Sequence, residues 1–420
     1  MKKKRLIIYI LQFAFIFAFF TTTVFMSKKK DGSLRFVSFQ KMRADYEFFW
    51  NFIYEGYPFT EVCERQGADL KKIKNEGYIE LRNIKNQKEY YTFYDKLCKK
   101  ITSDKKTGHL FPIHYKDYSD SLSSQGSYDV LNDKNKIIDK FYMEWQKRDG
   151  KIYHKNKSYA EKKIILENKI AYIKIHSFST FTYEQQKLYE DEINNFLMET
   201  AGYEHIIIDI TSNRGGSIDN CKLIIGPNLT DNKQVVFYGL YNENKYTKPY
   251  LDHIFKKINI EKININDIPN IENSNTIKND KAYMRRDSIS WQYLNGYKPC
   301  KIKKFWLLIG KLSYSASDRL AYMCKQSGFA TLIGENTGGA GVNAYWPMHI
   351  FLPNSGLLIL FDFTYGLNSE GYCADEFGNF PDIYNQPGKD ALETCLEEIK
   401  RLEENINNVE LYRNINSKKN

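Results

Sequence analysis

The stretch from Lys303 to Gly341, KKFWLLIGKLSYSASDRLAYMCKQSGFATLIGENTGGAG, decides the fold. Its apolar run from Phe305 to Ile309 is short, rich in β-forming residues and ended by Gly310, which is typical of a buried strand. Beyond Asp318 the apolar side chains recur at helical spacing, and a second apolar run leads into a glycine-rich loop. The stretch therefore predicts a strand, a tight turn, a short helix, a second strand and a glycine loop.

Serines crowd the predicted turn, where Ser313, Ser315 and Ser317 lie at or near the start of the helix. A hydroxyl at this place has backbone N–H groups beside it, and such groups can hold the negative oxygen of a tetrahedral intermediate. Serine and aspartate are also ordinary N-cap residues. The turn alone leaves both a nucleophile and a plain helix cap open.

On the N-terminal side, residues 169–178 (KIAYIKIHSF) alternate like a strand, residues 189–197 have a helical face, and residues 206–210 form a buried-type strand. Strand, helix, strand is the beginning of a parallel α/β layer. The second strand runs into TSNRGGS, where Gly215 and Gly216 allow the backbone to approach a ligand closely.

On the C-terminal side, residues 348–361 predict a β-hairpin around the turn Pro353-Asn354-Ser355-Gly356. A loop with Asp375 and Glu376 follows, and residues 392–399 predict a closing amphipathic helix. Acidic residues in loops are mostly solvated, so the position of this pair alone does not indicate a function.

The N-terminal part reads as helical between residues 36 and 98, because its apolar and aromatic side chains recur at intervals of three and four. The segment TGHL follows and puts His109 in a polar turn. A single histidine in a loop is usually only exposed, and His114 stands five residues further on. The polar residues 116–163 lack periodicity and predict a connecting region.

An uncharged apolar run from Leu6 to Met26 lies between two basic clusters. At ~1.5 Å per residue it is long enough to cross a hydrocarbon core of ~30 Å. A cleaved signal peptide is the alternative, but its apolar region usually spans only ~7 to 15 residues. We favour an uncleaved anchor, which predicts a cell-envelope protein whose main domain is periplasmic or extracellular; cleavage would leave a secreted protein.

Charge and cysteine usage exclude several classes. The 61 Lys and Arg against 51 Asp and Glu give a net charge of +10, but much of the surplus flanks the apolar run and Lys alternates with acidic residues elsewhere. This pattern is typical of a solvated surface and predicts no nucleic-acid partner. The seven cysteines are scattered without metal-ligand spacing, which argues against a zinc site and a disulfide-built scaffold but leaves one or two disulfides open outside the cytoplasm. No other residues imply a metal or an organic cofactor.

Taken in order, four segments resemble one family of serine peptidases, which includes the C-terminal-processing (tail-specific) proteases, the tricorn core and the retinoid-binding repeats of the interphotoreceptor matrix. The segments are KIAYIKIHSF, IIIDITSNRGG, SYSASDRLAYMCKQSGFATLIGENTGGAG, and DEFGNFPDI followed by GKDALE. The resemblance covers residues 169–402 and, more loosely, the helical segment through TGHL.

The resemblance implies that Ser315 is the nucleophile and that the N–H groups of Ala316 and of Gly215 or Gly216 hold the oxyanion. The processing branch has a lysine base in its glycine loop, but Ala340 stands there in this chain. The tricorn-like branch instead uses a histidine in a small-Gly-His turn, which corresponds to His109. The resemblance therefore implies a histidine base.

A carboxylate that orients the histidine is implied just before the family's G-x-x-P-D sequence. Counting back from Pro381-Asp382 through Gly378 gives Asp375 as the first choice and Glu376 as the reserve. In the tricorn-like branch the acid can act through a bridging side chain, so direct contact with His109 is not required.

The expected fold is α/β: a ββα (crotonase/Clp-like) catalytic domain that contains a parallel sheet, preceded by a small helical domain and a membrane anchor. The expected parts are an anchor or signal segment (1–30), a helical domain (36–110), a connecting region (111–165), a catalytic domain (166–405) with an insertion (242–301), and a polar tail (406–420).

The expected function is a serine endopeptidase acting on peptides or unfolded protein tails outside the cytoplasm, held to the membrane through residues 6–26. A catalytically inactive protein that binds peptides or hydrophobic ligands on the same scaffold is the alternative. An esterase or lipase is less favoured because the chain has no G-x-S-x-G elbow.

Overall fold

The computed structural model describes residues 37–118, 135–150, 158–275, 280–299, 303–343 and 346–417, with side chains described up to residue 404. The predicted anchor at residues 6–26 lies outside them. Within the described ranges, no helix combines the length and the apolar character that a membrane crossing requires.

A six-stranded sheet in the order β13-β9-β8-β4-β3-β2 forms the centre of the molecule. All of its neighbouring strands run parallel except the β2–β3 pair, which is antiparallel. This result confirms a mixed α/β fold with a largely parallel sheet. The strands are β2 (Ala160–Leu166), β3 (Ile170–Ile175), β4 (His205–Asp209), β8 (Lys304–Ile309), β9 (Ala330–Gly334) and β13 (Ile383–Tyr384).

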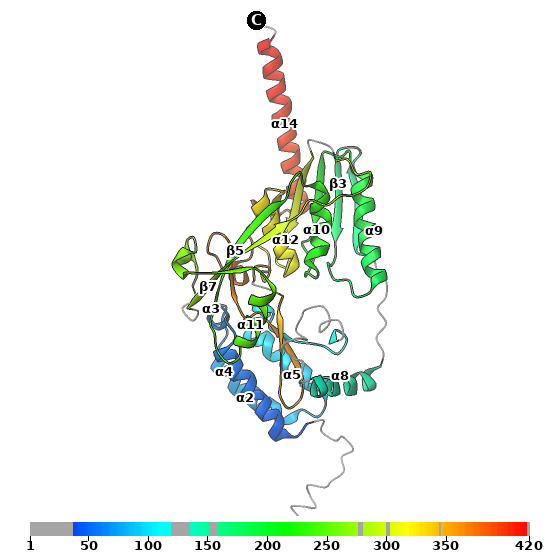
Figure 1. Ribbon diagram of the computed structural model, residues 1–420. Coiled ribbons are helices and arrows are strands. Elements are labelled where there is room, and N and C mark those ends of the chain that lie inside the picture. Colours follow the sequence, from blue (N-terminus) through cyan, green and yellow to red (C-terminus); the bar gives the residue numbers. More distant parts are fainter. Residues whose placement is uncertain are drawn as a thin grey trace, which may run out of the picture.

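Helices cover both faces of this sheet. Successive strand residues point to opposite sides, so apolar residues throughout a strand give the sheet two apolar faces to cover. Ile206 and Leu307 pack with α9 (Tyr183–Glu199), α10 (Ile218–Ile225) and α12 (Ala316–Ser327). Ile207 and Trp306 pack on the other face against the first turns of α14 (Ala391–Ser417), which then extends away from the body of the protein (Figure 1). The near-continuous apolar strands predicted from the sequence follow from this double burial.

A second, four-stranded sheet in the order β12-β5-β7-β6 contains much of the segment treated as an unpatterned insertion at 242–301. That segment forms α11 (Lys248–Lys257), β6 (Ile260–Ile263) and β7 (Lys281–Ile289), while its residues 276–279 and 300–301 are outside the described ranges. Strand β7 pairs with β5 (Lys233–Tyr241) over its whole length, so it is an integral part of the fold. Strand β12 (Tyr365–Leu367) completes the sheet.

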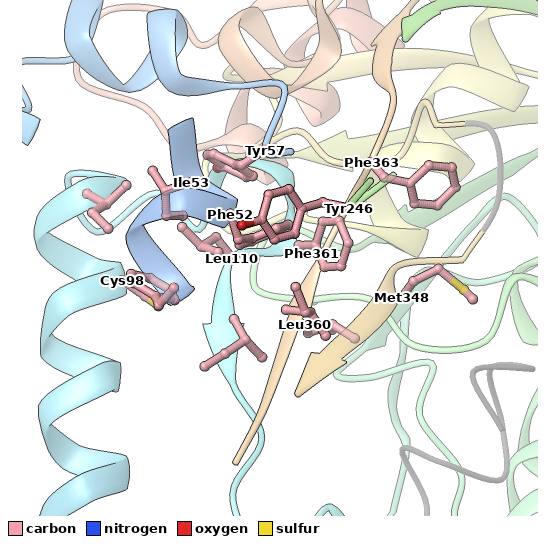
Figure 2. Close-up of a cluster of buried hydrophobic side chains, with 14 of the residues drawn as sticks. Phe52, Ile53, Tyr57, Cys98, Leu110, Tyr246, Met348, Leu360, Phe361 and Phe363 are labelled. Atoms are coloured by element: carbon pink, nitrogen blue, oxygen red, sulfur yellow. The ribbon is translucent and has the colours of Figure 1, made fainter. Parts of the chain in front are cut away.

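The helical region and the predicted hairpin share one hydrophobic core. Strands β10 (Met348–Phe351) and β11 (Leu358–Phe361) form the hairpin, with β1 (Phe111–Pro112) on the outer side of β11. Figure 2 shows Phe52 of α2 facing Phe361, and their ring centroids are 4.6 Å apart. This packing fixes the N-terminal helices, and the turn that follows them, against the rest of the chain. The helices are α2 (Phe39–Glu55), α3 (Thr60–Arg65), α4 (Leu70–Glu80) and α5 (Gln87–Ile101).

Part of the predicted connecting region is also ordered, as α8 (Asn135–Asp149) and strand β2. Residues 119–134 and 151–157 of that region lie outside the described ranges. Six of the seven cysteines are free and buried, and Cys300 is not among the described residues.

Candidate active site

Ser315 lies in the turn between β8 and α12, directly before the first residue of the helix. Its φ of 58° and ψ of −118° are a conformation that residues with a side chain rarely adopt, and such strain is concentrated at functional sites. The turn is held by the Ser315 N–H, which donates to Gly339 O (2.9 Å), and by Ser313, whose hydroxyl donates to Ile210 O (2.8 Å). The Ser313 hydroxyl is therefore engaged in holding the turn. Ser315 is the serine with the strained backbone, which makes it the candidate for a functional role.

His109 ends the 3-10 turn η2 (Thr107–His109), which follows α5. Gly108 has a φ of 55°, and a Cβ there would lie 2.4 Å from the Phe59 ring, so this position requires glycine. Both backbone groups of Gly108 are held: Asp362 N–H donates to its carbonyl (2.7 Å), and its N–H donates to Asp375 Oδ1 (2.6 Å). His109 itself has a φ of 51°, so the turn that carries the imidazole is also strained and fixed.

The fold brings Ser315 and His109 together, with a carboxylate behind them. His109 Nε2 is 2.9 Å from Ser315 Oγ, and His109 Nδ1 is 2.8 Å from Asp362 Oδ2. An Asp362 carboxylate can only accept at this contact, so Nδ1 carries the proton and Nε2 is free to accept from the serine hydroxyl. A hydroxyl, an imidazole and a buried carboxylate thus form one hydrogen-bonded chain. His114 is elsewhere, with its ring against Trp145.

Burial alone would lower the pKa of His109, but the negative charge and the hydrogen bond of Asp362 outweigh it, and the pKa is raised above its ordinary value of 6.5. The same interaction stabilises the imidazolium that forms when the ring takes a proton. His109 is therefore a stronger base than an isolated imidazole in an equally buried site.

The two acidic residues singled out in the sequence take other positions. Asp375, in α13 (Ala374–Phe377), accepts from the backbone N–H of Gly108 and does not contact the imidazole. Glu376 forms a bidentate ion pair with Arg65 of α3, at 2.8 Å for each contact. The carboxylate at His109 is Asp362, which follows β11 and also accepts from Asn343 Nδ2 (3.1 Å).

Asp362 is not among the acidic residues singled out from the sequence, although the sequence contains a signal for it. It is the only acidic residue between Gly356 and Asn368, in the otherwise apolar run GLLILFDFTYGLN. A carboxylate within a run that predicts a buried strand must be paired or hydrogen-bonded, because an unpaired buried charge is very costly. Such a residue is a candidate for a site.

Two of the predicted oxyanion residues, Gly215 and Ala316, lie beside Ser315, and Gly216 follows Gly215 in the chain, against Phe178 and Ser179. Gly215 has a φ of 101°, and a Cβ on it would lie 2.9 Å from both Ala316 N and Ser315 Cβ. The Gly215 N–H donates to Asn213 Oδ1 (2.9 Å), whereas the N–H groups of Gly216 and Ala316 have no acceptor among the described residues. Ala316 is the first residue of α12, where the helix dipole favours negative charge. The Ala316 N–H is thus a donor directly next to Ser315 that no described residue engages, and the Gly216 N–H is a second such donor in the neighbouring glycine turn.

A pocket of about 170 Å³ opens beside Ser315. Its walls come from α10, α12, the glycine loop and, on one side, from β7 of the four-stranded sheet. The wall has five charged residues: Asp219, Lys222, Arg285, Asp287 and Arg319. Of these, only Arg285 and Asp287 come from the segment 242–301, which reads in the sequence as an unpatterned insertion.

Among the described residues, one group could offer metal ligands: Glu204, His205 and Glu403. It lies at the start of β4, whereas Ser315 follows the end of β8, so it is at the opposite edge of the sheet. The Trp306 indole N–H donates to His205 Nδ1 (3.1 Å), and the Lys169 ammonium pairs with Glu403 (2.7 Å). His205 and Glu403 thus each have a partner, although Glu403 Oε1 accepts no hydrogen bond from the described residues, and the group takes no part in the site at Ser315.

Comparisons with known proteins place this chain in a family. The model of peptidase family S41 matches residues 169–384. A search of curated proteins found no significant match. Because the match covers more than half of the 420 residues, the chain belongs to peptidase family S41, the family of the C-terminal-processing proteases. The protein is a serine peptidase.

Several solved structures are similar to this chain at low identity. A candidate peptidase from Parabacteroides merdae is 18% identical, with 84% of this chain and 92% of that chain covered and a TM-score of 0.49. A lipoprotein from Streptococcus agalactiae is 13% identical, with 87% and 96% covered and a TM-score of 0.48. The tricorn protease is 15% identical over 55% of this chain and 17% of its own, with a TM-score of 0.29. Family membership rests on the family match alone.

Proposed function

We propose that this peptidase is an endopeptidase that hydrolyses peptide bonds by a Ser-His-Asp mechanism, with Ser315 as nucleophile, His109 as general base and Asp362 as the orienting acid. The observation that carries the proposal is the continuous chain from Ser315 Oγ through the imidazole to Asp362, with contacts of 2.9 and 2.8 Å. Both distances are within the reach that proton transfer requires. Use of a histidine base, together with Ala340 in the glycine loop, favours the tricorn-like branch of the family.

In the proposed reaction, Ser315 Oγ attacks the substrate carbonyl while His109 Nε2 takes its proton. The Ala316 N–H, and that of Gly216, stabilise the negative oxygen of the tetrahedral intermediate. His109 then gives the proton to the leaving amine, and water hydrolyses the acyl-enzyme with His109 again as base. Asp362 holds the imidazole in the required tautomer throughout.

The alternative is an inactive binding protein on the same scaffold. Two observations disfavour it: the nucleophile, base and acid are all present, and three residues with side chains at or near the site, His109, Ser315 and Ala340, keep positive φ values. A scaffold that only binds would not need backbone strain around a hydroxyl–imidazole pair.

We also propose that the enzyme acts outside the cytoplasm, anchored by residues 6–26. The support is the length of that uncharged run and the basic residues on both sides of it. Protease accessibility of a C-terminal tag tests this proposal in cells whose outer layers have been removed and whose cytoplasmic membrane is intact: a tag that is digested only after that membrane is broken contradicts it.

The experiment for the mechanism is labelling of the full-length protein with a fluorophosphonate, which reacts with activated serines without needing a peptide sequence. We expect labelling of the wild type and none of Ser315→Ala or His109→Ala. Ser317→Ala is the matched control, because the buried Ser317 hydroxyl has no hydrogen-bond partner among the described residues. A folded wild-type protein that stays unlabelled contradicts the proposed mechanism, and loss of labelling in Ser317→Ala contradicts the choice of serine.

A further inference from the structure

One wall of the pocket beside Ser315 is made by charged residues from two elements that are distant in the sequence. Arg285 and Asp287 come from β7, and Arg319 comes from the first turn of α12, directly behind the nucleophile. The Arg285 Nε–H donates to Asp287 Oδ1 (2.7 Å), and an Arg319 Nη2 hydrogen contacts Asp287 Oδ2. Two guanidinium groups therefore share one carboxylate.

The charge of this group is a net +1. Burial alone would raise the pKa of Asp287, but Arg319 and Arg285 outweigh burial and lower it, so the carboxylate is ionised at neutral pH. The other charged pair of the pocket, Lys222 and Asp219, lies 3.6 Å apart and adds no net charge. The pocket thus presents one excess positive charge beside the nucleophile.

This excess charge is in a poorly solvated place. Arg319 is 2% exposed, and its Nε–H has no acceptor among the described residues. Both guanidiniums lie over the apolar ring of Phe237, with Arg285 at 5.5 Å and Arg319 at 4.2 Å from its centroid. Electrostatic interactions are stronger in such a place than in water, and a buried cation that is incompletely paired is costly.

We propose that this pocket binds a carboxylate group of the substrate, so that the peptidase selects peptides with a negative charge at the position it receives. The inference rests on the proposed function, because it takes Ser315 as the point of cleavage. Carboxylates match the fork of guanidinium donors and form charge-assisted hydrogen bonds with it. A basic substrate side chain would meet the excess positive charge, and both oxygens of Asp287 are already engaged by arginines.

The pocket has room for this group. Its volume of about 170 Å³ is some ten times the ~15 Å³ that one water needs, so it admits a side chain rather than only solvent. A carboxylate can reach it from two sources. One is an Asp or Glu side chain next to the cleaved bond, and the other is the free C-terminus of a substrate cut near its end.

Three peptides of one sequence separate these sources, assayed with the full-length wild-type protein. The first has Glu before the cleavable bond and an amidated C-terminus, the second has Gln and a free C-terminus, and the third has Gln and an amidated C-terminus. We expect kcat/KM for one of the first two to exceed that of the third at least tenfold. The preferred peptide identifies the source.

The variant Arg285→Gln tests whether the guanidinium of Arg285 causes the preference for a carboxylate. We expect the preference to fall to a few-fold, and Arg285→Lys to keep part of it because the charge remains. Arg286→Gln is the matched control: it removes the same charge from the next residue of β7, whose side chain is half exposed and pairs with Glu261 (2.8 Å) away from the pocket. The control should keep the wild-type preference.

Equal cleavage of all three peptides by the wild type overturns the inference, and so does an Arg285→Gln protein that keeps the full preference. Neither result contradicts the proposed function if the fluorophosphonate still labels Ser315. Conversely, a wild type that neither reacts with the probe nor cleaves any peptide contradicts the proposed function itself.

Discussion

Two buried carboxylates reach the same turn, Thr107–His109, from different parts of the chain. Asp362 arrives at the end of β11 and meets the imidazole at Nδ1, whereas Asp375 arrives in α13 and meets the backbone N–H of Gly108. Both residues are buried aspartates, but the groups that their carboxylates contact differ. The comparison teaches that the role of a carboxylate near the proposed catalytic histidine depends on the atom that it contacts.

Their neighbourhood also separates them electrostatically. Burial, and next the negative charge of Asp362, raise the pKa of Asp375 from 3.8 to about 8. Asp375 therefore carries a proton at neutral pH, and its Oδ2 has no hydrogen-bond partner among the described residues. One carboxylate of the pair stabilises an imidazolium, while the other is a neutral group that holds the turn.

The largest expected effect comes from Asp362→Asn. The amide keeps the shape but cannot hold the Nδ1–H tautomer as a carboxylate does, so we expect kcat to fall by about 10⁴-fold, as for the equivalent change in other triads. The activity of the wild type should fall as the pH drops through the pKa of His109, because only the neutral imidazole accepts a proton. That pKa lies above 6.5 in the wild type.

In Asp362→Asn, the charge that opposes burial is removed, so the pKa of His109 should fall. The acid limb of the pH profile should therefore shift to lower pH. Measurement of kcat/KM against pH for both proteins checks the two expectations together. A profile that stays at the wild-type position in the variant contradicts the assignment of Asp362 as the partner of the imidazole.

Asp375→Asn is expected to have a smaller effect on rate. Its Oδ1 can still accept from Gly108, so we expect less than a tenfold loss of kcat. The variant should show itself in stability instead. In the wild type, the raised pKa means that the folded state binds a proton that the unfolded state has released, so the free energy of unfolding falls as the pH rises from about 4 to about 8.

Denaturant unfolding at several pH values between 4 and 9 measures this slope, which should be flatter for Asp375→Asn than for the wild type. A rate loss as large as that of Asp362→Asn would reverse the comparison and make Asp375 the orienting acid, as the family resemblance implied.

Regular parts of this site could be predicted from the sequence. The turn at Ser315 follows from an apolar strand, a serine-rich break and a helical face, all within one short segment. The choice of Ser315 among the three serines, and of His109 in its small-Gly-His turn with Ala340 in place of a lysine, was what the family resemblance implied. The local pattern alone predicted the turn and the helix but left the role of both residues open.

The positions of Asp362 and of the pocket wall depend on contacts that no local pattern encodes. Asp362 meets His109 across 253 positions of sequence, in a register set by the β10–β11 hairpin and its packing on α2. Strand β7 carries Met284, Arg285, Arg286 and Asp287 in succession because its middle faces a polar pocket and solvent. Because the alternation of apolar and polar residues is lost there, the sequence predicts an insertion in place of this strand.

Asn343→Ala tests how firmly Asp362 must be held. Asn343 Nδ2 donates to Asp362 Oδ1 at 3.1 Å, the oxygen that does not contact His109. A hydrogen bond to a charged group contributes about 1.5 to 3 kcal/mol, and His109 and the Asp362 backbone still hold the carboxylate, so we expect kcat to fall only several-fold. Steady-state kinetics on a good peptide substrate measure it. An unchanged kcat would mean that His109 and the Asp362 backbone suffice to orient the carboxylate.

The smallest effect is expected from Glu376→Gln, which separates the reserve acid from the site. Glu376 pairs with Arg65, whose side chain is 35% exposed, and solvent screens such a pair, so its loss should cost about 1 kcal/mol of stability or less. Because neither residue contacts Ser315, His109 or Asp362, kcat should stay within the error of the wild type. Arg65→Gln should behave in the same way, since it breaks the same pair from the other side. If Glu376→Gln lowered kcat strongly while Arg65→Gln did not, the carboxylate of Glu376 would act on the imidazole in the working enzyme, and the comparison would have to include a third acid.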